Sequence, residues 1–255
     1  MLGEQNSCSA EKSPKTALYS VSVAKTNFDI EQCLRLRYQV FANELGATIH
    51  SPAPGIDTDG FDQYCSHLMV KHNESGEVIA TTRLLTELDA AKAGMFYSES
   101  EFYMSPILAL PGNTMEIGRT CIHKNHRTGG ALNALWQGIA KVMLNEQIDY
   151  LIGCASIPAS DGGRYAQSVM NYLRGKHMAP PSLRVYPHRD VPEAPLPEKV
   201  EVVLPRLLKT YLLCGAVVCG EPYWDTDFKV ADVFIFVDRK RINARFAKHF
   251  LGINA

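Results

Sequence analysis

The sequence predicts a mixed α/β fold, with a mostly antiparallel sheet flanked by helices. Residues 67–72 and 78–85 have the composition of strands and are joined by a turn at 73–76, which indicates an antiparallel hairpin. Farther along, a strand over 115–122 leads through a glycine turn into a helix, and a second strand begins at Tyr150. We expect this strand–helix–strand unit to form the centre of the fold.

Further elements are predicted on both sides of that unit. An aromatic segment, MFYSESEFYM from Met95, either covers an apolar pocket or simply packs. We expect one domain over 17–255, after a polar tail at 1–16 and with a proline-rich insertion near 179–197. The other predicted elements are a strand at 18–24, a helix at 30–45 that ends near Gly46, a helix opened by Pro205 that runs to about residue 214, and strands at 216–219 and 230–237.

Composition excludes several classes of function. A formal charge of −1, without basic and aromatic residues interleaved, gives no reason to expect nucleic acid as a partner. The first residues lack the apolar core of a signal peptide and no later segment is long and apolar enough to span a bilayer, so we expect a cytoplasmic protein. Seven cysteines without a CxxC pair fit neither a disulfide framework nor a zinc site. His123 and His126 lack a third ligand at matching spacing, so no metal is expected.

The segment at 115–122 places charged residues inside what is otherwise a buried strand. Buried charges are costly unless they are paired or used. Glu116 and Gly118 point to one face and Arg119 to the other, so Glu116 and Arg119 each need their own partner. Downstream, Thr128 is a plausible N-cap for the following helix, and the backbone amides behind Gly129 and Gly130 form an anion site suited to a phosphate.

This order of strand, glycine turn, helix and strand resembles the GNAT acyltransferase superfamily, whose members hold a phosphopantetheine thioester between two splayed strands. Further motifs resemble the branch that contains bacterial ornithine N-acyltransferases, the first enzymes of ornithine-lipid synthesis; acyl-homoserine lactone synthases share a sparser version. The resemblance implies a GNAT-like twisted sheet with a splayed central strand pair. The motifs, in chain order, are RLRYQVFANELGA from Arg35, DTDGFDQYCSHLMV from Asp57, ATTRLL from Ala80, MEIGRTC from Met115 and PRLLKTYLLCGAVVCGEPYWDTDF from Pro205.

The resemblance implies an enzyme that moves a long acyl chain, with or without a 3-hydroxyl group, from acyl carrier protein to the α-amine of ornithine, giving lyso-ornithine lipid. It implies an acyl-carrier thioester as co-substrate and no tightly bound cofactor. One alternative is an N-acyl amino acid synthase that uses glycine, lysine or tyrosine. Others are a homoserine lactone synthase, which must also bind S-adenosylmethionine, and a noncatalytic acyl-carrier or membrane-binding protein that kept the fold.

Amide formation from a thioester requires a neutral amine, a proton acceptor and donors for the developing oxyanion. Glu116, where the strands splay in the family, is expected to take the proton directly or through water, with its pKa raised by burial. Amides of the Gly118 strand are expected to bind the thioester oxygen, and Gly118 to permit the bulge that opens the gap. The alternative is that Glu116 pairs with Arg83 or Arg37 to hold the sheet.

For the acceptor, the resemblance implies a cluster of arginines and spaced acids. An arginine suits the carboxylate of an amino acid, and an aspartate suits the side-chain ammonium of ornithine. A buried ionic cluster is as often a scaffold, and the spacing does not decide between these interpretations. The expected substrate-binding residues are Arg37, Phe41, Asp57, Asp59, Asp62, Arg83 and Arg119.

The predicted phosphate loop departs from the pattern Q/R-x-x-G-x-G/A that is usual in acetyl-coenzyme A users, because His126 occupies its first position. This loosened loop fits a carrier-protein donor better than coenzyme A. Lys124 and Arg127 either face the acidic carrier or belong to an ordinary solvated turn. The expected phosphopantetheine and carrier residues are Lys124, Arg127, Thr128, Gly129 and Gly130.

The C-terminal segment combines basic and apolar residues at helical spacing. Such a segment either lies on the anionic surface of the inner membrane, as a peripheral contact, or packs its apolar stripe on the core. The residues concerned are Arg241, Ile242, Arg245, Phe246, Lys248 and Phe250.

Overall fold

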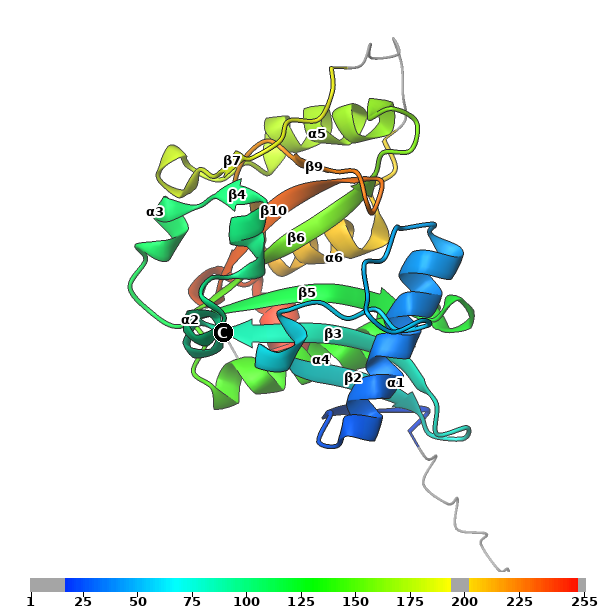
Figure 1. The fold of residues 1–255 in the computed structure, drawn as a ribbon. Coiled ribbons are helices and arrows are strands. Elements are labelled where there is room, and N and C mark those ends of the chain that lie inside the picture. The colour runs from blue at the N-terminus through cyan, green and yellow to red at the C-terminus, as the bar shows by residue number, and fades with distance from the viewer. Residues whose placement is uncertain (1–16, 194–201, 252–255) are drawn as a thin grey trace, which may run out of the picture.

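An eight-stranded sheet forms the centre of the molecule in the computed structural model, which describes residues 17–193 and 202–251 (Figure 1). Its order is β1-β2-β3-β5-β6-β10-β8, with β9 also paired to β10. Every pair is antiparallel except β5–β6, which is parallel, so the mostly antiparallel α/β sheet is confirmed. The strands are β1 (Tyr19–Val23), β2 (Ser66–His72), β3 (Val78–Thr86), β5 (Thr114–Ile122), β6 (Tyr150–Pro158), β8 (Val217–Val218), β9 (Tyr223–Asp225) and β10 (Val230–Asp238).

Helices cover both faces of this sheet. In Figure 1, α1 crosses the front of β2, β3 and β5, whereas α4 lies behind the same strands. A separate two-stranded sheet joins β4 (Phe102–Tyr103) to β7 (Tyr186–Pro187). The α-helices are α1 (Asn27–Tyr38), α2 (Glu87–Ala93), α3 (Ser105–Leu108), α4 (Gly130–Asn145), α5 (Arg164–Lys176), α6 (Arg206–Cys214) and α7 (Ala244–Phe246). Short 3₁₀ turns are η2 (Asp62–Tyr64), η3 (Tyr97–Ser100), η4 (Lys124–His126), η5 (Pro181–Leu183) and η6 (Arg239–Arg241), and π-helical turns are η1 (Gln39–Glu44) and η7 (Ala247–Leu251).

Local sequence explains where the first helix begins and ends. The Thr26 side chain accepts a hydrogen bond from the Asp29 amide and caps the helix, so α1 begins three residues before the predicted Ile30. The π-turn η1 extends it to Glu44, and Gly46 ends it with a left-handed φ of 72°. The N-cap of α4 is Gly129, at a φ of 104°, and not Thr128 as predicted, because the chain turns into the helix one residue later.

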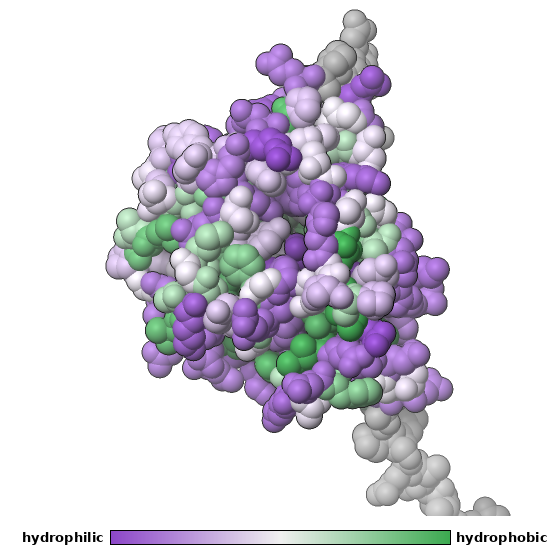
Figure 2. Space-filling model, in the orientation of Figure 1, coloured by the Kyte–Doolittle hydropathy of each residue, from purple (hydrophilic) through white to green (hydrophobic). Residues whose placement is uncertain are grey.

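The two largest of four hydrophobic clusters among the described residues lie on either side of the sheet's second half and hold most of the core. The larger lies between the sheet and α4, α5 and α6. The smaller holds Phe96, Phe102 and Met104 of the aromatic segment against Phe234 and Phe236 of β10. Packing of that segment is therefore observed, and Figure 2 shows apolar residues reaching the surface beside it, around α3.

The central parallel pair stays together for only three residues on each strand. Thr114–Glu116 pair with Tyr150–Ile152, and no pairing follows. A Cβ on Gly153 would lie 2.3 Å from the carbonyl oxygen of Ile117, so only glycine allows the close approach of the two backbones just before they separate. Gly118, which was expected to permit the bulge that opens the gap, has open space where a Cβ would lie.

A β-bulge follows immediately on the other side of β5. Thr81 and Arg83 pair with Cys121 and Gly118, so two residues of β5 oppose Thr82 alone. The left-handed residue of the bulge is Arg119, with a φ of 50°, and not the glycine before it. Strict alternation predicted that Arg119 points to the face opposite Glu116 and Gly118, but the bulge interrupts the alternation and all three residues line the same cavity.

Two of the predicted segments lie wholly or partly outside the described residues. They are the tail at 1–16 and the end of the proline-rich insertion, 194–197. Ile242 and Phe246 of the C-terminal segment pack against the larger core, with the Phe246 ring 5.2 Å from that of Trp136. No helix among the described residues is long and apolar enough to cross a bilayer.

Candidate active site

A cavity of about 410 Å³ opens where β5 and β6 separate. Figure 2 shows hydrophilic residues lining a hollow near the middle of this face. One wall consists of Glu116, Gly118 and Arg119 from β5, and the other of Cys154 and Ser156 from β6. The splay thus exposes the charged part of the central strand to a space enclosed by protein.

Glu116 lies at the bottom of the splay and is fully buried. Its carboxylate accepts hydrogen bonds from the amides of Tyr97 (2.6 Å) and Ser98 (2.8 Å) and from the Ser98 hydroxyl. It forms no ion pair with Arg37 or Arg83, so the predicted structural alternative is not what the contacts show. Three donors occupy most of its acceptor capacity and tie β5 to the turn η3.

Burial and hydrogen bonding act on Glu116 in opposite directions. Burial raises the pKa of the Glu116 carboxyl, since it disfavours the charged form, whereas the donors on Ser98 and Tyr97 lower it. Burial is the larger effect, and the pKa lies above its ordinary value. A carboxylate of raised pKa that faces the cavity has the properties of a proton acceptor.

Six charged residues from four parts of the chain form a compact ionic cluster beside the cavity. Arg37 of α1 donates to Asp57 (2.9 Å) and Asp62 (2.6 Å). Arg83 of β3 donates to Asp59 (2.6 Å) and Asp62 (3.2 Å). All six residues are among those that sequence analysis selected; the sixth, Arg119 of β5, reaches Asp59 at 3.3 Å.

The charges in this cluster balance, three against three. Burial acts to raise the pKa of Asp62, but Arg37 and Arg83 hold it well below its ordinary range. Burial acts to lower the pKa of Arg37, yet Asp62 and Asp57 raise it. The acids are therefore engaged with arginines, as expected of a scaffold.

Arg119 lines the cavity, as Arg83 does, and is the most exposed of the three arginines. Its guanidinium lies between the rings of Tyr97 (5.0 Å) and Phe228 (4.6 Å), and its Nε atom is buried without a hydrogen-bond partner in the described structure. It also lines a second cavity of about 290 Å³, next to Asp59. The Nε atom lies 3.8 Å from a carboxylate oxygen of Asp57, so Arg119 belongs to the ionic cluster and also lines both cavities.

A third cavity, of about 540 Å³, adjoins the first on the side of the glycine turn. The two share Phe41, Leu45, Thr120 and Leu207 in their walls. The third cavity is mostly apolar and ends at the N-terminus of α4, which has no side-chain cap. This arrangement can accommodate an apolar chain with an anion at the helix end. The loop residues in its wall are Arg127, Thr128 and Gly129.

The basic residues of the turn differ in their surroundings. Arg127 is held by Glu44, with a distance of 2.8 Å from Nη2 to Oε2, and by the Ile122 carbonyl oxygen at 2.9 Å. Lys124 is exposed, as is Gly130, whose Cα lies close to the Tyr19 ring. Arg127 therefore fixes the turn to η1, whereas Lys124 faces solvent.

Several residues of the site were missed by sequence analysis. Tyr97 and Ser98 meet Glu116 largely through backbone amides, which leave no signal in the sequence. Glu101, Asp225 and Asp232 converge on the same cavity from distant segments. For Asp225 the sequence offered a signal, since the residue lies in the conspicuous run EPYWDTDF.

Comparison with known proteins agrees with this geometry. Residues 36–137 match the acetyltransferase (GNAT) domain family. The chain is 31% identical to an L-ornithine N(alpha)-acyltransferase of Rhizobium meliloti (strain 1021), over 89% of this chain and 82% of that protein. It is 29% identical to the protein of the same name from Rhodobacter capsulatus, over 91% and 94%.

Two solved structures share the fold. The AHL synthase LasI matches with a TM-score of 0.52 and 12% identity, covering 93% of this chain and 96% of that one. FeeM, an N-acyl amino acid synthase from uncultured soil microbes, matches with a TM-score of 0.51 and 11% identity, over 88% and 94%. The GNAT-like fold is thereby confirmed, and with it the predicted acyltransferase class. The chain belongs to the L-ornithine N(alpha)-acyltransferase family.

Proposed function

We propose that this acyltransferase moves a long fatty acyl chain, including 3-hydroxy chains, from acyl carrier protein to the α-amine of ornithine, giving lyso-ornithine lipid. The observation that carries the proposal is the position of Glu116, a buried carboxylate that faces the cavity between the splayed strands. The names of its relatives supply ornithine as the acceptor.

The proposed reaction forms one bond and breaks one. The neutral α-amine attacks the thioester carbon, the C–N bond forms, and the C–S bond breaks to release the phosphopantetheine thiol. Glu116 takes the proton that the amine sheds, directly or through a water, and passes it on to the leaving sulfur or to solvent. Backbone amides of β5 at Gly118, beyond the last residue paired with β6, bind the thioester oxygen while negative charge develops on it.

The third cavity is the proposed donor side. Its apolar wall suits an acyl or pantetheine chain, and the uncapped amides of α4 behind Gly129 and Gly130 suit a single phosphate. Thr128 lies in the wall of the same cavity. Lys124 and Arg127 are proposed to meet the acidic surface of the carrier, although Arg127 also pairs with Glu44.

The acceptor side is proposed to lie around Arg119 and Phe41. Arg119 lines the cavity and can bind the substrate carboxylate, while its guanidinium also pairs with Asp57 and Asp59. Phe41 lies in the walls of both the first and the third cavity, where acceptor and donor must meet. The pairing of Arg37 and Arg83 with Asp57, Asp59 and Asp62 favours a scaffold role for those five residues.

Peripheral membrane contact from the cytoplasmic side remains a prediction. Ile242 and Phe246 pack on the core, so contact would have to use the basic side of the segment, which includes Arg241 and Arg245. Sedimentation with anionic vesicles tests it. Binding that persists in an Arg241→Ala, Arg245→Ala variant would contradict a role for this segment.

The decisive experiment for the proposed function is a competition assay with purified protein. Acyl chains on carrier protein and on coenzyme A are offered with an equimolar pool of amino acids, and products are identified by mass spectrometry. We expect N-acyl ornithine, formed faster from the carrier. Acylation of glycine, lysine or tyrosine instead would favour a different N-acyl amino acid synthase. Absence of any product would favour the noncatalytic alternative.

A further inference from the structure

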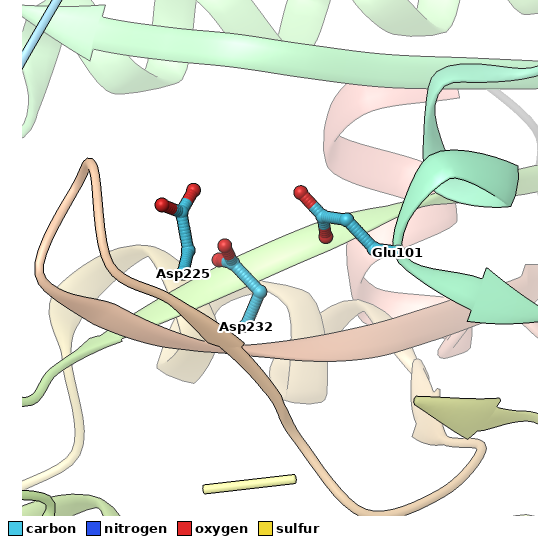
Figure 3. A group of neighbouring side chains, drawn as sticks. All are labelled: Glu101, Asp225 and Asp232. Carbon is cyan, nitrogen blue, oxygen red and sulfur yellow. The ribbon is translucent and has the colours of Figure 1, made fainter. Parts of the chain in front are cut away.

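Three carboxyl groups meet on the wall of the central cavity opposite β5. Glu101 follows η3, Asp225 ends β9 and Asp232 belongs to β10. One oxygen from each lies within 4.8 Å of the others. Figure 3 shows the three side chains turned toward one another, although they come from separate segments.

These acids have polar contacts but no basic partner. Asp232 accepts a hydrogen bond from the Ser156 hydroxyl at 2.7 Å, and Asp225 accepts from the amides of Asp227 and Phe228, each at 2.9 Å. In the described part of the chain, no lysine, arginine or histidine forms an ion pair with any of the three.

Glu101 is the clearest sign of an unfilled site. Its side chain is almost completely buried, at 3% exposure, and its Oε2 atom has no hydrogen-bond partner. A buried carboxylate oxygen without a hydrogen-bond donor lowers the free energy of unfolding, so its presence is a cost to the stability of the fold. Burial, followed by the charge of Asp232, raises the pKa of Glu101 well above its ordinary value, although the neighbouring Cys154 and Tyr97 side chains act to lower it. Burial also raises the pKa of Asp232, to about 7.

The acids of the ionic cluster on the other side of the cavity, by contrast, have basic partners. There, three arginines offset Asp57, Asp59 and Asp62, so those acids already have cations. Among the described residues, the acids of the group at Glu101 have no ion pairs of this kind, so a cation that binds among them would stabilise their charged forms. Arg119, which pairs with Asp57 and Asp59 in the ionic cluster, also lines this cavity.

We propose that Glu101, Asp225 and Asp232 form the subsite that binds the cationic side chain of the amino acid acceptor, a primary ammonium such as that of ornithine. The assignment rests on the proposed function, because it places an amino acid in this cavity. An ammonium has three donors arranged tetrahedrally, so acceptors about 2.8 Å from its nitrogen lie roughly 4.6 Å apart. The three carboxylate oxygens lie within 4.8 Å of one another, which accommodates that arrangement.

This subsite completes the recognition of a zwitterion with a charged tail. Arg119 binds the carboxylate, the three acids bind the ω-ammonium, and the α-amine remains for the thioester near Gly118. Norvaline, which has the same carbon chain without the terminal amine, would leave the acids without a partner. Selectivity against it follows from that unmatched charge.

The test compares ornithine with norvaline in acyl transfer and in direct binding. Wild-type protein is expected to prefer ornithine by about 30-fold or more in kcat/KM, and ornithine but not norvaline should raise Tm. In Glu101→Gln and Asp232→Asn the ratio of the two kcat/KM values should fall at least tenfold, and the Tm shift with ornithine should disappear.

Asp227→Asn is the matched control, since it removes a nearby negative charge outside the group. The Asp227 side chain is 56% exposed and faces His50. It should keep the wild-type ratio. Melting without substrate checks folding. Glu101→Gln and Asp232→Asn should melt no lower than the wild type, because each removes a carboxyl group whose charged form burial disfavours.

The outcomes separate this inference from the proposed function. Acylation of ornithine with an undiminished ornithine-to-norvaline ratio in both variants overturns the subsite and leaves the proposed function standing. No acylation of any amino acid by the wild type overturns both. A Tm increase with Mg²⁺ or Ca²⁺ that Asp232→Asn abolishes, without any increase from ornithine, would identify a metal site and also overturn the ammonium assignment.

Discussion

Replacing Ser98 with alanine tests whether Glu116 is the proton acceptor, because it changes the basicity of that carboxylate without altering the carboxylate itself. The Ser98 hydroxyl donates to Oε1 of Glu116, and the amides of Ser98 and Tyr97 remain in place after the substitution. A hydrogen bond to a charged group contributes about 1.5–3 kcal/mol. One pKa unit corresponds to about 1.4 kcal/mol, so the pKa of Glu116 should rise by roughly 1–2 units.

The assay is the pH dependence of kcat at saturating acceptor and donor. A base must be unprotonated to act, so a higher pKa moves the acid limb of the profile to higher pH. Comparison with wild type on the same substrates cancels the ionisation of ornithine itself. We expect the acid limb in Ser98→Ala to move upward by about 1–2 pH units.

Ser100→Ala is the control from the same turn. The Ser100 hydroxyl donates to the Tyr97 carbonyl oxygen at 2.6 Å and does not contact Glu116. Its profile should match the wild type. If the acid limb of Ser98→Ala stays where the wild type has it, the limb belongs to another group, and Glu116 serves to hold the turn η3 against β5.

Four further outcomes follow from the geometry. Glu116→Gln should lower kcat by a factor on the order of 100, and normal turnover by a variant that melts like wild type would make the residue structural. Charge reversal at Lys124 and Arg127 should raise KM for the carrier thioester more than KM for ornithine; equal effects would refute carrier docking at this turn. Gly153→Ala should lower the free energy of unfolding by about 1–3 kcal/mol, whereas Gly175→Ala, in open space on α5, should not lower it. The folded state raises the pKa of Asp232 from 3.8 to about 7 and so binds its proton more tightly than the unfolded state does, which means that the stability of the wild type falls as pH rises through this range. The Tm gain of Asp232→Asn should therefore grow between about pH 4 and pH 7, and a constant gain would contradict the burial argument.

Short-range patterns predicted most of the fold. The hairpin β2–β3 and the unit β5–α4–β6 follow from turn residues and periodicity, which depend only on neighbours in the chain. Helix α5 was missed although Ala166, Val169, Met170 and Leu173 have helical spacing and are all buried.

The candidate site was predictable where charged side chains form it, and not where backbone amides make the contacts. The sequence motifs predicted Arg37, Asp57 and Asp62 as site residues, and in the structure Arg37 forms ion pairs with both aspartates. The amide of Ser98 that binds Glu116 carries no sequence signal. The meeting of Glu101 with Asp232 depends on how distant strands are placed, which no local pattern encodes.

The six-residue ionic cluster constrains how this sequence can diverge. Loss of one partner from a buried pair costs roughly 3–5 kcal/mol, a large part of the stability of an ordinary domain. Asp62 serves both Arg37 and Arg83, so a single neutralising substitution there would leave two arginines short of a partner. Substitutions in this cluster should therefore spread only as compensating sets. Lineages that change acceptor should do so through the cavity wall, while the cluster is inherited whole.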